Sequence, residues 1–157
     1  MKKIILLAIL AVVSFTAKAQ DTKPYEEKMA KLESAFKELE DAYHSFSKRD
    51  PATFTDAEKA QLNQIMVKAD SLDSVQTATA LEIAEKFKTT KFPARYLADV
   101  MYNLEYDQLK QLCDPSTGYY NEPGMEKVKK LLASYELRHP GLMYKELTME
   151  DLNGKQV

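Results

Sequence analysis

The apolar side chains between residues 25 and 46 recur at alternating spacings of four and three residues. They are Tyr25, Met29, Leu32, Phe36, Leu39, Tyr43 and Phe46. This spacing places them on one narrow face of a helix, as in a coiled coil, while charged residues occupy the other faces. The pattern therefore predicts a long helix whose apolar seam needs a partner.

A second long helix is predicted after a break at residues 49–51, Arg-Asp-Pro. Thr55 and Glu58 have the spacing of a capping box, in which each side chain bonds to a backbone amide of the other residue. The helix is expected to run to about Thr89, with a polar middle around Thr77 that indicates a bend or an exposed stretch. Its apolar positions are Leu62, Ile65, Met66, Ala69, Leu72, Val75, Ile83, Ala84 and Phe87.

The short connection between the two predicted helices favours a long antiparallel helical hairpin. Mutual burial of the two apolar seams is the simplest interpretation, because packing alone demands one periodic face per helix. A client-binding arm and a dimerisation element are the functional alternatives.

Shorter helices are expected after Pro93, because proline marks helix boundaries. The predicted units are residues 94–104, residues 107–113 and a fifth helix opened by Pro123, with a loop at residues 114–118. No repeat period relates these units, so the fold class is mainly α, a non-repeating helical domain over residues 20–140.

Residues 141–157 lose the helical spacing of apolar residues, and their pattern predicts a β-hairpin. Residues 147–149 alternate between apolar and polar, and Asn153-Gly154 is a strong signal for a two-residue turn. An isolated hairpin is marginal in water, so residues 141–157 are interpreted as the start of a β-containing domain. The alternative is that these strands pack on the helices as a tail.

The first nineteen residues have the layout of a secretory signal peptide. Lys2 and Lys3 precede a largely apolar run at residues 4–15, and an A-x-A cleavage site ends at Ala19. A membrane anchor is the alternative, but twelve residues of helix span only about 18 Å of a roughly 30 Å hydrocarbon core. We therefore expect cleavage between Ala19 and Gln20, no stable membrane anchor, and a periplasmic or secreted location.

Charge and cysteine content exclude several classes of protein. Removal of the signal peptide leaves 19 basic and 24 acidic residues, a formal net charge of −5, so the basic surface of a nucleic-acid-binding protein is missing. Cys113 is the single cysteine, which excludes an internal disulfide, a C-x-x-C pair and a cysteine-rich zinc site. Cys113 is interpreted as a small buried hydrophobic residue rather than a reactive free thiol.

The sequence contains no recognisable catalytic, cofactor-binding or metal-binding motif. The two histidines, His44 and His139, lack metal-ligand spacing, and the carboxylates alternate with lysines as on a solvated helix face. Tyrosines crowd one stretch, where half-buried packing is favoured over the lining of a binding groove. They are Tyr96, Tyr102, Tyr106, Tyr119 and Tyr120.

Two segments resemble a known group of proteins. Residues 91–97, Lys-Phe-Pro-Ala-Arg-Tyr-Leu, and the short helical unit at residues 106–112 resemble the helical region of exported thioredoxin-like proteins of the TlpA/ResA and AhpC/TSA-like kind. Residues 139–157 are similar to the start of the thioredoxin-like domain in that group, although its A-P-D reads Tyr144-Lys145-Glu146 here. The matching positions are Gly141, Leu147, Thr148, Asp151, Gly154, Lys155 and Val157.

The resemblance implies a thiol-disulfide oxidoreductase, with a thiol substrate or a protein partner. The W-C-x-x-C motif of the group follows the segment that resembles residues 139–157, so the chain is expected to be truncated before its redox centre. The alternative is a different class of protein, a non-enzymatic periplasmic helical module such as a coiled-coil holdase or scaffold. The long apolar seam at residues 25–46 and the charged residues on the other helix faces favour it.

Overall fold

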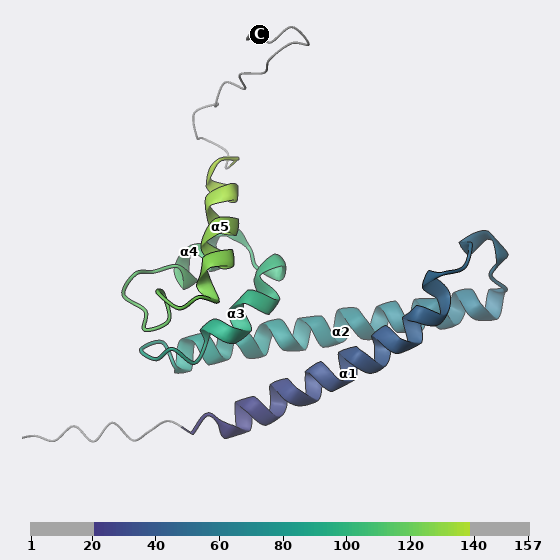
Figure 1. Cartoon of the computed structure of the whole chain (residues 1–157), viewed down its shortest axis with the longest axis horizontal. Coiled ribbons are helices and arrows are strands. Elements are labelled where there is room, and N and C mark those ends of the chain that lie inside the picture. The colour runs from purple at the N-terminus through teal and green to yellow at the C-terminus, as the bar shows by residue number, and fades with distance from the viewer. Residues whose placement is uncertain (1–20, 139–157) are drawn as a thin grey trace, which may run out of the picture.

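The computed structural model describes residues 21–138, and within this part of the chain the regular structure is entirely helical. Helix α1 spans Lys23–Ser47 and helix α2 spans Asp56–Lys86. The two helices run antiparallel and pack along their length, which confirms the predicted helical hairpin (Figure 1). A short 3₁₀ helix, Pro51–Thr53, lies in the connection between them.

The start of α2 is set by the predicted capping box. The backbone N–H of Glu58 donates to Thr55 Oγ1 at 3.3 Å, and the backbone N–H of Thr55 donates to Glu58 Oε2 at 2.8 Å. At the other end α2 stops at Lys86, three residues before the predicted Thr89. A turn replaces the last predicted residues, with the Thr90 N–H donating to the Phe87 carbonyl oxygen at 2.8 Å.

Three shorter helices follow, close to the predicted units. They are α3, Ala94–Val100; α4, Tyr106–Leu112; and α5, Met125–Glu136. The predicted unit at residues 94–104 is divided, because a 3₁₀ helix, Met101–Asn103, follows α3. Helix α5 starts after the predicted Pro123, since the Met125 N–H donates to the Glu122 carbonyl oxygen in a preceding turn.

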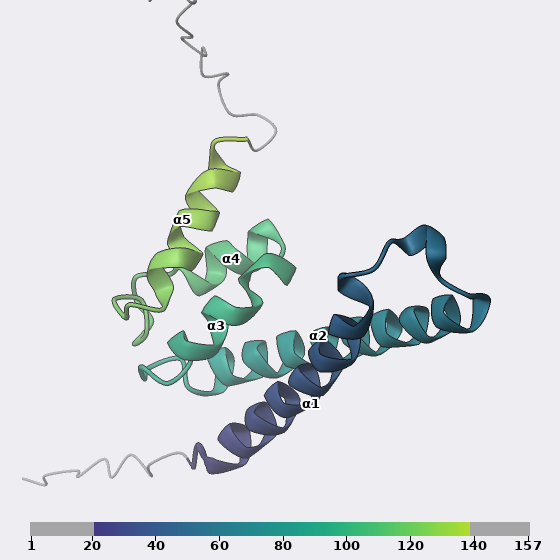
Figure 2. The same ribbon diagram turned by 45° about the vertical axis from the view of Figure 1, so that its right-hand side comes forward.

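The three short helices pack over the half of the hairpin where α1 begins and α2 ends, and the other half projects away from them (Figures 1 and 2). Helix α3 contacts α2, and α5 packs against both α3 and α4. The main core lies between these layers. Its largest fully buried side chains include Ile83, Phe87, Leu97, Leu109 and Met125.

A second, smaller apolar cluster lies at the tip of the hairpin. It consists of the buried side chains Phe46, Phe54 and Ile65, with Leu39, Ala42 and Leu62 packed against them. The apolar seam of α1 is not buried along its whole length. Met29, Leu32 and Phe46 are buried, but Tyr43 is 42% exposed. The seam is therefore less complete than a coiled-coil pattern predicts.

The polar middle of α2 is not the exposed stretch that the sequence suggested. Thr79 is 1% exposed, and its hydroxyl donates to the Val75 carbonyl oxygen at 2.7 Å. Thr77 is half-buried and accepts a hydrogen bond from Asn103 Nδ2 at 3.1 Å. Helix α2 continues through this region, with the Thr79 hydroxyl bonded to the backbone of its own helix and Thr77 bonded to Asn103.

Several expectations fall outside the described residues. The signal peptide, its cleavage between Ala19 and Gln20, and the predicted β-hairpin of residues 141–157 all lie there. Residues 21–138 contain no strand, and none of their helices is long and apolar enough to cross a membrane.

Candidate functional site

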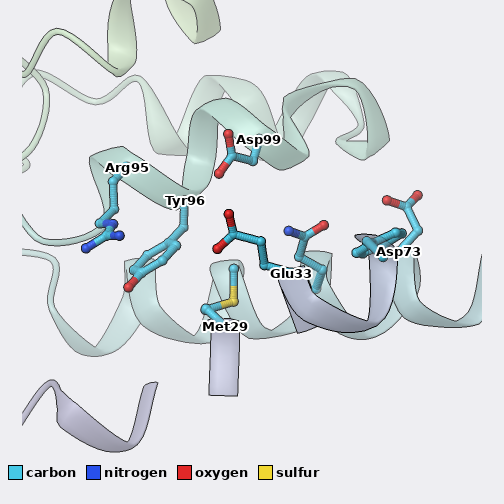
Figure 3. Close-up of a pocket in the computed structure, with 8 residues that line it drawn as sticks. Met29, Glu33, Asp73, Arg95, Tyr96 and Asp99 are labelled. Atoms are coloured by element: carbon cyan, nitrogen blue, oxygen red, sulfur yellow. The ribbon is translucent and has the colours of Figure 1, made fainter. Parts of the chain in front are cut away.

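A groove of about 550 Å³ opens where α3 packs beside the hairpin (Figure 3). Three helices supply its walls, and we call it the α1–α2–α3 groove. It is lined by Met29, Glu33, Phe36, Asp73, Gln76, Arg95, Tyr96 and Asp99.

Helical spacing explains why these side chains meet. On α1, Met29, Glu33 and Phe36 follow one another at four and three residues, so they share one face. Asp73 and Gln76 have the same relation on α2, and Arg95 and Asp99 have it on α3. The groove is therefore assembled by tertiary packing of three helices.

The floor of the groove is apolar. Met29 and Tyr96 are buried, and Phe36 is half-buried. The guanidinium of Arg95 lies over the Tyr96 ring, with Cζ 4.9 Å from the ring centroid, a cation–π contact. Burial raises the pKa of the Tyr96 phenol, so this side chain is neutral at physiological pH.

The rim of the groove is acidic. Glu33 and Asp99 approach from α1 and α3, and Asp73 lies farther along α2 (Figure 3). Among residues 21–138 these three carboxylates have no ion pair or side-chain hydrogen bond. Arg95 supplies the one positive charge among the described residues that line the groove. An apolar floor under three carboxylates suits a ligand that is both apolar and cationic.

The sequence did not indicate this groove. Glu33 belongs to the charged residues that the sequence places on the faces of the first helix away from its apolar seam, and neither Asp73 nor Asp99 has a motif around it. Their convergence depends on where α3 packs, which local periodicity does not specify. The groove offers no cysteine or histidine, and the described residues contain no cluster able to hold a metal ion.

Cys113 lies away from the α1–α2–α3 groove, at the C-terminal cap of α4. It is half-buried and packs against the main core. Burial raises the pKa of its thiol, and the nearby Lys129 acts in the opposite direction with a smaller effect. A raised pKa lowers the thiolate fraction, which disfavours nucleophilic chemistry at this residue.

The crowded tyrosines and His44 do not form a common site. Tyr96 and Tyr119 are buried, Tyr106 and Tyr120 are half-buried, and Tyr102 is 74% exposed. Of the five, Tyr96 alone lines the α1–α2–α3 groove. His44 is exposed on α1, with Nε2 3.7 Å from Glu40 Oε1.

Comparisons of the chain with protein-family models, curated protein sequences and solved structures find no match.

Proposed function

We propose that residues 21–138 are the helical module of an exported thioredoxin-like thiol-disulfide oxidoreductase, and that a thioredoxin-like domain starts at residue 141. The observation that carries the proposal is the motif in residues 139–157, with Gly141, Thr148 and Asp151 at matching positions. It begins directly after α5, which ends at Glu136. The last helix of the described residues therefore ends shortly before the motif begins.

In this proposal the helical module has a binding or orienting role and the thioredoxin-like domain carries the chemistry. The environment of Cys113 supports this division of roles between the two parts. A half-buried thiol with a raised pKa is a poor partner for disulfide exchange. The α1–α2–α3 groove supports it as well, since its lining can bind a ligand but offers no thiol.

The nucleotide sequence beyond the Val157 codon tests the proposal. We expect an open reading frame with an in-frame W-C-x-x-C motif, and a product that catalyses reduction of insulin disulfides. The 157-residue chain alone should not catalyse that reaction. A stop codon at this point without a downstream motif contradicts the proposal, and so does insulin reduction by the 157-residue chain.

A second candidate is a non-enzymatic helical interaction module, acting as a holdase or scaffold. Exposed apolar side chains on the hairpin favour it, because such side chains often mark protein-binding surfaces. Tyr43, Met66 and Val75 are each between 42% and 49% exposed. Suppression of aggregation of an unfolded outer-membrane protein, measured alongside mass by light scattering, tests this candidate. A monomer without suppressing activity eliminates it.

A further inference from the structure

We propose that the α1–α2–α3 groove and its continuation along the hairpin bind a basic, amphipathic helical segment of a partner protein. The two candidate functions give the helical module a general binding role, and this proposal adds the binding surface and the chemistry of its occupant. The proposal also does not depend on a redox domain, because its test measures peptide binding and not thiol chemistry.

The groove continues beyond α3 as a strip of exposed side chains. Tyr43 follows Phe36 by seven residues on α1, and Met66 precedes Asp73 by seven on α2, so each lies two turns farther along the same helix face. Tyr43 and Met66 are 42% and 49% exposed. Helices α3 to α5 cover only the opposite half of the hairpin (Figure 1). The apolar floor is therefore extended towards the tip.

Charge specifies the occupant of this surface. Glu33, Asp73 and Asp99 line the groove without an ion pair among the described residues. Asp70 is exposed one turn from both Met66 and Asp73, which adds a fourth carboxylate to the strip. Arg95 is held over the Tyr96 ring at the α3 end. A partner with lysine or arginine side chains beside apolar ones complements this arrangement.

The dimensions favour a helix over a small cation. Met29 and Tyr43 are separated by fourteen residues of α1, which corresponds to about 21 Å at 1.5 Å per residue. A partner helix of about 14 residues matches this length, with apolar side chains at one helical face and basic side chains beside them. A small cation could contact the carboxylates at one point but would leave the apolar floor uncovered.

The probe is a fluorescein-labelled helical peptide of about 14 residues, built from leucine on one face and lysine on the others. We expect saturable binding to the full chain by fluorescence anisotropy, weakened by added salt because the charges are exposed. Two control peptides carry glutamate in place of lysine, or serine in place of leucine, and we expect neither to saturate. Equal binding of either control peptide overturns the proposal.

The first variant replaces the groove carboxylates, Glu33→Gln, Asp73→Asn and Asp99→Asn together. Loss of three attractive charge pairs at the protein surface should raise Kd about tenfold. The matched control, Glu27→Gln, Glu38→Gln and Asp41→Asn, removes the same charge from other faces of α1 and should leave Kd within about twofold. Equal Kd values for the two triple variants overturn the proposal.

The second variant tests the apolar strip with single substitutions at neighbouring exposed positions. Met66→Ser should raise Kd about fivefold through lost apolar burial. Val67→Ser, one residue farther round α2 and 60% exposed, should not change it. Both side chains are exposed, so we expect both variants to stay folded. Circular dichroism checks this. Equal effects of the two substitutions, or no saturable binding of the leucine–lysine peptide, overturn the proposal.

Discussion

At the scale of single residues, two glycines allow close approach between segments distant in the sequence. The backbone N–H of Gly118 donates to the Lys88 carbonyl oxygen at 2.8 Å, and a Cβ at Gly118 would overlap the backbone of Thr89. Gly124 has a similar relation to the Ala94 carbonyl. These contacts hold the segment before α5 against the turn between α2 and α3.

Gly118→Ala should destabilise the chain by about 1–3 kcal/mol, because overpacking against a backbone forces the segment to move. The turn after α2 cannot yield as a flexible side chain would, since the overlapping atoms belong to the Thr89 backbone. Urea unfolding followed by circular dichroism measures the change in unfolding free energy. Asn121→Ala, at an exposed position of the same segment, is the control and should stay within about 0.5 kcal/mol of wild type. Equal stability of the two variants would contradict the proposed close packing.

At the scale of elements, the turn of the hairpin is organised around Glu58. Its Oε1 lies 2.5 Å from Arg49 Nη1, and its Oε2 accepts from the Thr55 N–H at 2.8 Å. The Arg49 guanidinium also lies over the Phe54 ring, with Cζ 5.1 Å from its centroid. The hydrogen bond from Arg49, followed by those from Thr55, lowers the pKa of Glu58 to about 2.

The lowered pKa of Glu58 predicts an acid-dependent contribution to hairpin stability. Because the folded pKa lies below the ordinary value of 4.5, the contribution is present above pH 4.5 and is lost as the pH falls towards about 2. Glu58→Gln should therefore lower Tm at pH 7, and the difference from wild type should shrink between pH 5 and pH 2. Thermal scans at several pH values measure this, with Glu27→Gln as a control for loss of one surface carboxylate. A Tm difference independent of pH would show that the carboxylate charge does not stabilise the turn.

Local patterns predicted the elements well, because their causes are local. Apolar spacing predicted α1 and α2, and the Thr55–Glu58 spacing predicted the capping box that starts α2. The groove needed information that the spacing does not contain. Glu33 and Asp99 line one groove only because α3 packs on α2 beside α1, and the Thr79 hydroxyl is buried for the same kind of reason. Tertiary packing decided both outcomes.

At the scale of the whole molecule, the described residues contain two apolar clusters of unequal extent. The main core joins residues as distant as Met29 and Val128, and it includes side chains from α1, α2, α3, α4 and α5. The tip cluster draws on Phe46, Phe54 and Ile65 from the hairpin alone. This division predicts that the main core can form without the tip.

Replacing residues 40–71 with a glycine–serine turn of about five residues tests this prediction, because loops of that length join antiparallel helices. Leu39 and Leu72 would flank the new turn, and both line one pocket on the hairpin, so the ends of the retained helices are close together. The shortened chain should keep a cooperative thermal transition, since the buried side chains of the main core are all retained. Calorimetry and circular dichroism measure the transition. Phe87→Ala in the shortened chain should abolish it, because loss of a buried phenylalanine costs about 3–5 kcal/mol.

A shortened chain without a cooperative transition would show instead that the tip is required for the main core to fold. That result would make the hairpin one cooperative unit from its turn to the α3–α5 layer, whereas retention of the transition would leave the tip free to vary for partner binding.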